Sequence, residues 1–248
     1  RPRSIVANMD DVRGADFLAL PVEKRMSFSL TDASDVRADD YGVSFSYDGT
    51  DFTLPLPGRF NVLNALAAIR ASEALGVPLA VCAKVLRELG PINGRVEHID
   101  AGQDFLAVVD YAHTPDSLRA LYEAFPQKRK ICVLGNTGGG RDTWKRPEMG
   151  RIADEACEKV ILTNEDPYDE DPRAIVEAMA RGMARQPEII MDRREAIRAA
   201  LSNAHLGDAV LISGKGTDPF IMGPKGSREP WNDAIVVREE LERLLAKV

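Results

Sequence analysis

The stretch FLAVVDYAHTPDSLRALYEAFPQKRKICVL, residues 105–134, decides the fold of the larger part of this 248-residue chain. Two short apolar runs, Phe105–Asp110 and Lys130–Leu134, flank a segment near 115–125 whose apolar residues recur with helical spacing. Short apolar strands that alternate with amphipathic helices are typical of a mostly parallel sheet covered on both faces. The stretch therefore predicts one strand-helix-strand unit of an α/β domain.

The same rhythm continues to the C-terminus. We expect further strands at 159–163, 188–191 and 209–213, and helices near 146–157, 172–184, 193–204 and from 238 to the end. This alternation predicts the fold class α/β, with a Rossmann-like, mostly parallel sheet and helices on both faces.

A different pattern precedes this region. Strand-like alternation in Val43–Tyr47 is followed by Asp48-Gly49, which is a hairpin signal, and helices are expected at about 62–75 and 78–89. One face of the first helix is expected to carry Val62, Ala65, Leu66, Ile69 and Leu75. Turn formers cluster at Gly90–Gly94. We therefore place a domain boundary there, with an α+β part at residues 1–92 and the α/β part at residues 93–248.

Charge and composition restrict the partners. The net charge of −7 and a pI near 5.2 argue against nucleic acid or an anionic membrane as a partner. No apolar run approaches the ~20 residues that span a bilayer, and no signal-peptide pattern opens the chain. Cys82, Cys132 and Cys157 form no C-x-x-C pair, so we expect buried thiols rather than a disulfide or zinc site. Because the chain begins with Arg1, we expect a processed or excised piece of a longer protein.

Parallel sheets bind ligands at the carboxyl ends of their strands, so the informative loops follow residues 110, 134, 163 and 213. In the first loop, Thr114 and Pro115 suit the start of a helix, whereas Asp110 and His113 are not needed for it. These two side chains have either a structural role or a ligand-binding role, and the sequence leaves both open.

The second loop, Gly135–Asp142, combines four glycines with Arg141, and Lys145 and Arg146 follow it. Glycine allows a backbone that exposes N–H groups to an anion, and the cations add positive charge. The spacing matches neither a dinucleotide fingerprint nor a Walker A loop. We interpret the loop as an anion site, with a plain tight turn as the alternative.

The third loop, Asn164–Pro172, is acidic, and the fourth, Ser213–Pro219, contains a Gly-Lys-Gly turn. The acidic residues either solvate a loop and cap a helix, or form a negative wall that favours a substrate ammonium group. Upstream, Asn61 and Asn64 lie one helical turn apart and are able to read a purine edge or to cap the helix. Arg95 falls at the domain boundary, where phosphates often bind.

The order of these motifs resembles a known family. G-x-F-N-x-x-N, G-R-[MV]-E, D-Y-A-H-T-P, G-x-x-G-G-x-R-D-x-x-K-R-P, D-x-P and G-K-G occur in this order in Mur ligases of the MurE type, the UDP-N-acetylmuramoyl-tripeptide synthetases. The resemblance runs from about Gly58 to the C-terminus. It implies that residues 1–92 are the end of a central ATPase domain and residues 93–248 the C-terminal amino-acid-binding domain.

The resemblance also implies a function. Such an enzyme is an ATP-dependent carboxylate–amine ligase that adds a diamino acid to UDP-MurNAc-L-Ala-D-Glu in peptidoglycan synthesis. The acceptor carboxylate attacks the ATP γ-phosphate, and the amino group of the incoming residue then attacks the acyl phosphate. The expected cofactors are ATP and Mg²⁺, with the Mg²⁺ ligands mainly in a part absent from this chain. A monomer in the bacterial cytoplasm is expected.

Site residues follow by position in the motifs. The resemblance assigns ATP contacts to Asn61, Asn64, Arg95, Asp110 and His113. It assigns amino-acid contacts to Arg141, Glu165, Asp166, Pro167, Tyr168, Gly214 and Asp218. It assigns no catalytic residue and no metal ligand within the chain.

Two departures from the family pattern bear on specificity. Members that use meso-diaminopimelate carry Asp-Asn-Pro-Arg where this chain has Glu165-Asp166-Pro167-Tyr168, and Gly-Lys-Gly-His-Glu where it has Gly-Lys-Gly-Thr-Asp. Losing a cation at Tyr168 and gaining a carboxylate at Asp166 favours an amine-ended substrate, so L-lysine is expected over meso-diaminopimelate.

The family's P-loop is absent from the chain, so this piece alone is expected to be inactive. Two other functions stay open: a catalytically inert module that binds a nucleotide or amino acid, and a ligase similar to folylpolyglutamate synthetase.

Overall fold

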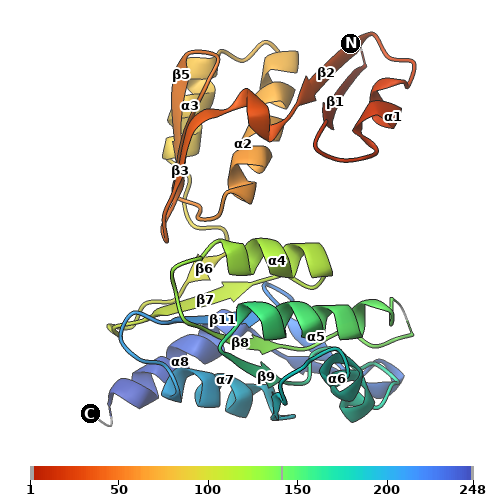
Figure 1. Ribbon diagram of the computed structural model, residues 1–248, viewed down its shortest axis with the longest axis vertical. Coiled ribbons are helices and arrows are strands. Elements are labelled where there is room, and N and C mark those ends of the chain that lie inside the picture. Colours follow the sequence, from red (N-terminus) through yellow and green to blue (C-terminus); the bar gives the residue numbers. More distant parts are fainter. Residues whose placement is uncertain (1–2, 141, 247–248) are drawn as a thin grey trace. The chain divides into compact units, whose positions relative to one another are not determined.

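The computed structural model describes residues 3–140 and 142–246. The chain divides into two compact units, Arg1–Pro91 and Ile92–Val248, and each is described by itself (Figure 1). None of the helices in the described part is long and apolar enough to cross a bilayer.

The described residues of the first unit form a parallel strand pair, an antiparallel sheet and three helices. The strands are β1 Ser4–Asn8 with β2 Lys24–Phe28, and β3 Ser34–Ala38, β4 Val43–Tyr47 and β5 Thr50–Leu54. The helices are α1 Gly14–Leu18, α2 Phe60–Ala74 and α3 Leu79–Arg87, and the short 3-10 turn η1 spans Leu30–Asp32. The predicted hairpin is confirmed: Tyr47 pairs with Thr50, and both turn residues, Asp48 and Gly49, have positive φ.

The core of this unit forms where α2 packs on the strands. Val62, Leu66 and Ile69 are buried in one apolar cluster with Phe45 and Phe52. The apolar face predicted for this helix is therefore confirmed in its first three turns. Leu75 was wrongly placed on it: the helix has ended there, and the side chain is 77% exposed.

The second unit is built on a six-stranded sheet in the order β10-β9-β8-β11-β7-β6 (Figure 1). The strands are β6 Glu97–His98, β7 Leu106–Asp110, β8 Lys130–Leu134, β9 Lys159–Leu162, β10 Glu188–Ile189 and β11 Ala209–Ser213. All neighbouring strands pair in parallel except the edge strand β6, which runs antiparallel to β7. The predicted, mostly parallel sheet is confirmed.

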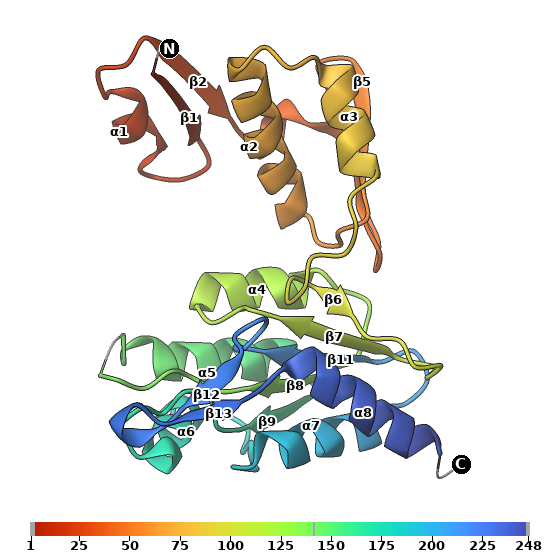
Figure 2. The same ribbon diagram turned by 180° about the vertical axis from the view of Figure 1, so that it is seen from behind.

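Helices cover both faces of this sheet. They are α4 Pro115–Glu123, α5 Lys145–Ala156, α6 Pro172–Ala180, α7 Arg193–Ser202 and α8 Asp233–Leu245. Figure 1 shows α4, α5 and α6 on one face, and Figure 2, from behind, shows α7 and α8 on the other. The predicted α/β class is therefore confirmed.

The clearest differences from the expected elements of the second unit are the start of the last helix and an extra pair of strands. The last helix begins at Asp233 rather than Arg238, because the Asn232 side chain accepts a hydrogen bond from the Ile235 N–H and so caps an earlier start. A small antiparallel pair, β12 Phe220–Met222 with β13 Arg228–Pro230, was not predicted; the turn η2 Pro224–Gly226 joins it.

The expectation of free thiols is wrong for two of the three cysteines. Cys132 and Cys157 form a disulfide with Cα atoms 6.2 Å apart, and Cys82 is a buried free thiol. Cys132 lies in β8, and Cys157 ends α5 just before the neighbouring strand β9. Parallel pairing of the two strands brings together cysteines that are 25 residues apart, which no local spacing reveals.

Candidate functional site

A cavity of about 320 Å³ lies at the carboxyl edge of the sheet in the second unit. The loops that follow β7, β8, β9 and β11 all contribute to its wall, as predicted from the position of these strand ends. Six predicted site residues line it: His113, Glu165, Asp166, Tyr168, Gly214 and Asp218.

Two glycines let the loops approach closely enough to form this cavity. A Cβ atom on Gly138 would collide with the carbonyl oxygen of Pro167, and one on Gly214 would collide with the Glu165 carboxylate. Gly214 also has a φ of +106°, a conformation that other residues rarely adopt. The Gly138 N–H donates to the Asp166 carbonyl at 2.7 Å, which joins the second loop to the third.

Glu165 carries a buried carboxyl group that is only half satisfied. Its Oε1 atom accepts a hydrogen bond from Thr137 Oγ1 at 2.8 Å, whereas Oε2 has no hydrogen-bond partner among the described residues. Burial raises the pKa of the Glu165 carboxyl, and the nearby Arg193 guanidinium partly opposes that shift. A buried acceptor without a partner is costly unless a ligand supplies one, so Oε2 is a candidate ligand contact.

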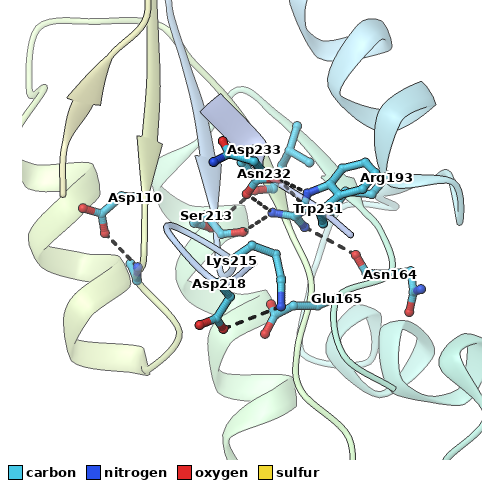
Figure 3. Close-up of polar contacts among 12 residues, drawn as sticks. Asp110, Asn164, Glu165, Arg193, Ser213, Lys215, Asp218, Trp231, Asn232 and Asp233 are labelled. Atoms are coloured by element: carbon cyan, nitrogen blue, oxygen red, sulfur yellow. Dashed lines mark hydrogen bonds and ion pairs between the residues drawn. The ribbon is translucent and has the colours of Figure 1, made fainter. Parts of the chain in front are cut away.

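Asp166, in contrast, is already paired. Lys215 Nζ lies 2.8 Å from both carboxylate oxygens, and the Met222 N–H donates to Oδ1 at 2.8 Å. Lys215 is fully buried, and its Nζ atom also lies 3.6 Å from the Asp218 carboxylate. Figure 3 marks this contact with a dashed line. The extra acidic residue expected to attract an amine is therefore largely neutralised by Lys215 of the same chain.

The first loop is held by Asp110. Its buried carboxylate accepts hydrogen bonds from the N–H groups of Val96 at 2.8 Å and Ala112 at 2.7 Å. Burial raises the pKa of Asp110, and these two bonds act in the opposite direction. The contacts observed for Asp110 are structural, because they fix the loop that carries Tyr111 and His113.

Tyr111 stands between Arg95 and His113. The Arg95 guanidinium lies over the Tyr111 ring, 4.9 Å from its centre, and the His113 ring meets that ring edge-on at 4.8 Å. His113 Nδ1 lies 2.8 Å from the Tyr111 carbonyl oxygen. The Tyr111 hydroxyl donates to Asp218 at 3.4 Å, so this ring links the first loop to the fourth.

The glycine loop binds an anion of its own chain. Arg146 pairs with Glu170 at 2.9 Å and donates to the Thr137 carbonyl, and the Gly140 N–H donates to the Glu170 carboxylate. The predicted anion-binding chemistry is present, but Glu170 supplies the anion. Lys145 is different: it is 9% exposed, lines the cavity, and forms no side-chain ion pair with any described residue.

Three further predicted residues, Asn61, Asn64 and Pro167, are described by the structure and are not among the residues that line the cavity. Asn61 and Asn64 belong to the first unit, where Asn61 Nδ2 donates to the Pro57 carbonyl and Asn64 Nδ2 to Asn61 Oδ1, so their observed contacts secure the start of α2. Pro167 contributes its backbone to the close approach with Gly138. Arg141 lies outside the described residues.

Sequence reasoning did not assign five residues that line the cavity to amino-acid contact: Tyr111, Thr137, Gly138, Asp142 and Lys145, of which Lys145 was interpreted only as a cation of the anion site. All five belong to the two motifs that marked the first and second loops. Position in those motifs was the available signal, but the sequence did not show which side chains face inward.

A second, larger depression of about 770 Å³ shares Asp142 and Lys145 with the cavity. It is lined by the starts of α4 and α5 and by the exposed Trp144. Its arginines are already paired, because Arg119 and Arg151 both contact Glu148. The smaller cavity is the better candidate, since Glu165, whose buried Oε2 atom has no hydrogen-bond partner among the described residues, lines it and does not line the larger depression.

This arrangement suits a zwitterion. Glu165 Oε2 and the Asp218 carboxylate are acceptors for an ammonium group, and Lys145 is a donor for a carboxylate. A small amino acid carries both charges. The cavity wall thus offers partners for both charged groups of an amino acid, with more negative than positive charge among its lining residues.

Comparison with known proteins gives a consistent result. Residues 94–216 match the family "Mur ligase, glutamate ligase domain". The chain is 36% identical, over 96% of its length, to the UDP-N-acetylmuramoyl-L-alanyl-D-glutamate–2,6-diaminopimelate ligase of Caldanaerobacter subterraneus subsp. tengcongensis, and it covers 52% of that protein. It is 38% identical, over 96% of its length, to the UDP-N-acetylmuramyl-tripeptide synthetase of a Roseiflexus species, and it covers 51% of that protein.

A solved structure of a UDP-N-acetylmuramoyl-L-alanyl-D-glutamate–2,6-diaminopimelate ligase is also similar. It superposes with a TM-score of 0.61 at 31% identity, over 98% of this chain and 54% of the other. The chain thus spans about half the length of the curated relatives that it matches.

Proposed function

Because the chain belongs to the Mur ligase family, with the glutamate ligase domain at residues 94–216, we propose that it supplies the diamino-acid-binding part of a peptidoglycan ligase. In this proposal residues 1–92 end the central ATPase domain, and residues 93–248 bind the amino acid. The complete enzyme would join the diamino acid to UDP-MurNAc-L-Ala-D-Glu with ATP as the energy source. The names of relatives from bacteria support this assignment.

The observation that carries the proposal is the unsatisfied Glu165 carboxylate in the cavity. One buried Glu165 oxygen, which has no partner among the described residues, lies beside Gly214, and the resemblance to the family assigns both residues to contact with the amino acid. An ammonium group would satisfy this oxygen and neutralise the buried charge. Proximity of that amine to the activated carboxyl group would then be the main contribution of this domain to the reaction.

The identity of the diamino acid follows from the remaining charges. Preference for L-lysine rested on Tyr168 and Asp166, but Lys215 already neutralises Asp166. Lys145 offers a cation for a second carboxylate, which meso-diaminopimelate has and L-lysine lacks. Together with the printed names of the relatives, this supports meso-diaminopimelate as the first candidate and L-lysine as the second.

The nucleotide side of the proposal involves the first loop. We assign Arg95 and His113 to contact with ATP, because Arg95 is exposed and the hydrogen bond of His113 to the described residues uses Nδ1. Asp110 is assigned to holding the loop rather than to the ligand. Within residues 3–140 and 142–246, no group of three or more His, Cys, Asp or Glu side chains stands ready for a metal, so no Mg²⁺ ligand is proposed.

Calorimetric titration of this chain with meso-diaminopimelate, L-lysine and L-glutamate tests the proposal. Binding of a diamino acid, with no binding of glutamate, is the expected result. Preference for L-glutamate would favour a folylpolyglutamate synthetase-like ligase instead. The inert-module alternative requires a further assay: the complete enzyme containing this chain would bind the diamino acid and yet form no amide bond.

A further inference from the structure

A buried ion pair lies behind the cavity wall. The Arg193 and Asp233 side chains are 1% and 0% exposed, and two hydrogen bonds of 2.9 and 2.6 Å join them (Figure 3). Arg193 is the first residue of α7, and Asp233 is the first residue of α8. The pair therefore connects two helices on the same face of the sheet.

Arg193 also donates to the backbone of two cavity loops. Its Nη2 atom donates to the Ser213 carbonyl at 2.9 Å, and Nη1 donates to the Asn164 carbonyl at 3.4 Å. Ser213 directly precedes Gly214, and Asn164 directly precedes Glu165. One guanidinium group thus holds the carbonyl that stands immediately before each of two cavity residues.

The Asp233 side of the pair reaches the fourth loop as well. Trp231 Nε1 donates to Asp233 Oδ1 at 2.7 Å, and the Trp231 N–H donates to the Pro219 carbonyl at 2.9 Å. Pro219 follows Asp218, which lines the cavity and contacts Tyr111. The buried Arg193–Asp233 pair is therefore linked by hydrogen bonds to the residues next to Glu165, Gly214 and Asp218.

We propose that Arg193 is the positioning residue of the amino-acid site, setting the separation between Glu165 and the Gly214–Asp218 loop through the carbonyls of Asn164 and Ser213. It touches no ligand itself, and the inference rests on the proposed function. A planar guanidinium with fixed donors suits this task, because it holds several acceptors in one geometry. Supporting groups of this kind determine whether a binding site keeps its productive shape.

The charge of Arg193 has a second effect. Its guanidinium is the strongest of the influences that oppose the burial-induced rise in the pKa of Glu165. A lysine would retain this positive charge but lose the forked hydrogen bonds. The variant Arg193→Lys therefore separates positioning from charge.

The experiment compares three variants of this chain with the unaltered protein. Arg193→Lys removes the forked hydrogen bonds of the guanidinium group. Trp231→Phe removes only the side-chain hydrogen bond from Trp231 to Asp233. Arg129→Lys is the matched control, since Arg129 also joins an aspartate and a backbone carbonyl, but at the opposite edge of the sheet. Calorimetry measures diamino-acid affinity, and amide hydrogen exchange is followed in residues 163–170 and 213–220.

Arg193→Lys is expected to weaken diamino-acid binding on the order of tenfold and to speed exchange in these two segments only. Trp231→Phe changes both readouts in the same direction by less, and it provides the test if Arg193→Lys does not fold. Arg129→Lys leaves both unchanged. The inference is overturned if Arg193→Lys binds and exchanges like the unaltered chain. It is also overturned if exchange rises equally across the whole sheet, which would indicate a merely structural role.

The two proposals fail separately. An unaltered chain that binds no diamino acid contradicts the proposed function, while the exchange measurements still decide whether Arg193 positions the loops.

Discussion

The two edges of the parallel sheet use the same residue types in different ways. At the amino edge, Arg129 and Asp208 directly precede β8 and β11, and they pair at 2.9 Å with Arg129 39% exposed. At the carboxyl edge, Arg193 and Asp233 pair at 2.6 Å and are almost completely buried. Both arginines also hold backbone carbonyls of neighbouring loops.

The two edges also differ in the pKa shifts and hydrogen-bond partners of their buried acidic residues, Asp208 and Glu165. Burial works to raise the pKa of Asp208, but hydrogen bonds from Arg129 and His205 outweigh it and the pKa is lowered. Burial raises the pKa of Glu165, and no internal partner satisfies its Oε2 atom within the described chain. The Asp208 carboxylate at the amino edge is therefore satisfied within the chain, whereas Glu165 Oε2 at the carboxyl edge has no partner among the described residues, as its proposed role in ligand binding requires.

The largest expected effect is a loss of folding stability that leaves ligand affinity unchanged. The disulfide links β8 to Cys157, just before the amino end of β9, and closes a 25-residue separation. Its loss through Cys157→Ser should lower the free energy of unfolding by about 3 kcal/mol, since the unfolded chain regains loop entropy. Denaturant titration measures this change. Diamino-acid affinity should stay the same, and a parallel loss of affinity would show that the two edges are coupled.

The second prediction concerns removal of the Glu165 charge, which is proposed to contact the ligand. Glu165→Gln should weaken diamino-acid binding by about 1.5–3 kcal/mol, or roughly 10- to 150-fold, because a charged hydrogen bond is lost. Calorimetry measures the affinity, and thermal unfolding checks that the variant folds. Asp208→Asn is the matched control at the amino edge: it should lower stability and leave affinity unchanged. Unaltered affinity in Glu165→Gln would contradict the assignment of the site.

The third prediction concerns pH. Because burial raises the Glu165 pKa above its ordinary value, the carboxylate takes up a proton earlier on acidification than an exposed glutamate does. Affinity for an ammonium group should therefore fall as the pH drops through this raised pKa, and Glu165→Gln should lack that dependence.

Stability should respond to pH differently at the two edges. For Glu165, the unfolded chain loses its proton first, so its contribution to stability falls as the pH rises from the ordinary to the raised pKa. For Asp208, whose pKa is lowered, the contribution is present above the ordinary pKa and is lost as the pH falls through the lowered value. Unfolding free energies of Glu165→Gln and Asp208→Asn across the acidic range should therefore deviate from the unaltered chain in opposite directions.

The smallest expected effect is at Lys145. Lys145→Met should weaken binding by about 1 kcal/mol, or roughly fivefold, since one partly shielded ion pair to a ligand carboxylate is lost. The loss should be greater for meso-diaminopimelate than for L-lysine, because only the former has a second carboxylate. Competitive calorimetry with both compounds provides the comparison. Equal loss for the two would place Lys145 at the carboxylate that they share.

The sequence predicted the elements of the second unit well because its signals are local. The run Ala209–Ser213 is wholly apolar up to its last residue, and both it and Lys130–Leu134 were predicted with their observed bounds. The start of α8 was missed because its determinants are a side-chain cap at Asn232 and a buried charge at Asp233, neither of which is apolar.

The site was predicted at the level of its loops but not of its pairings. Motif positions placed Glu165, Gly214 and Asp218 around one cavity, as found. The partner of Asp166 could not be inferred, since Lys215 is 49 residues away and its orientation depends on the packing of two loops. The contacts of Glu170 and Arg193 could not be predicted for the same reason, because each joins segments that are far apart in the sequence.

The most direct test of the central claim is a map of amide chemical shifts in the isotope-labelled chain as meso-diaminopimelate is added. The account predicts shift changes at Gly138, Tyr168 and Gly214 on the carboxyl edge, and none at Gly207 or Ala184 on the amino edge. Changes confined to the amino edge, or spread evenly over the sheet, would contradict it.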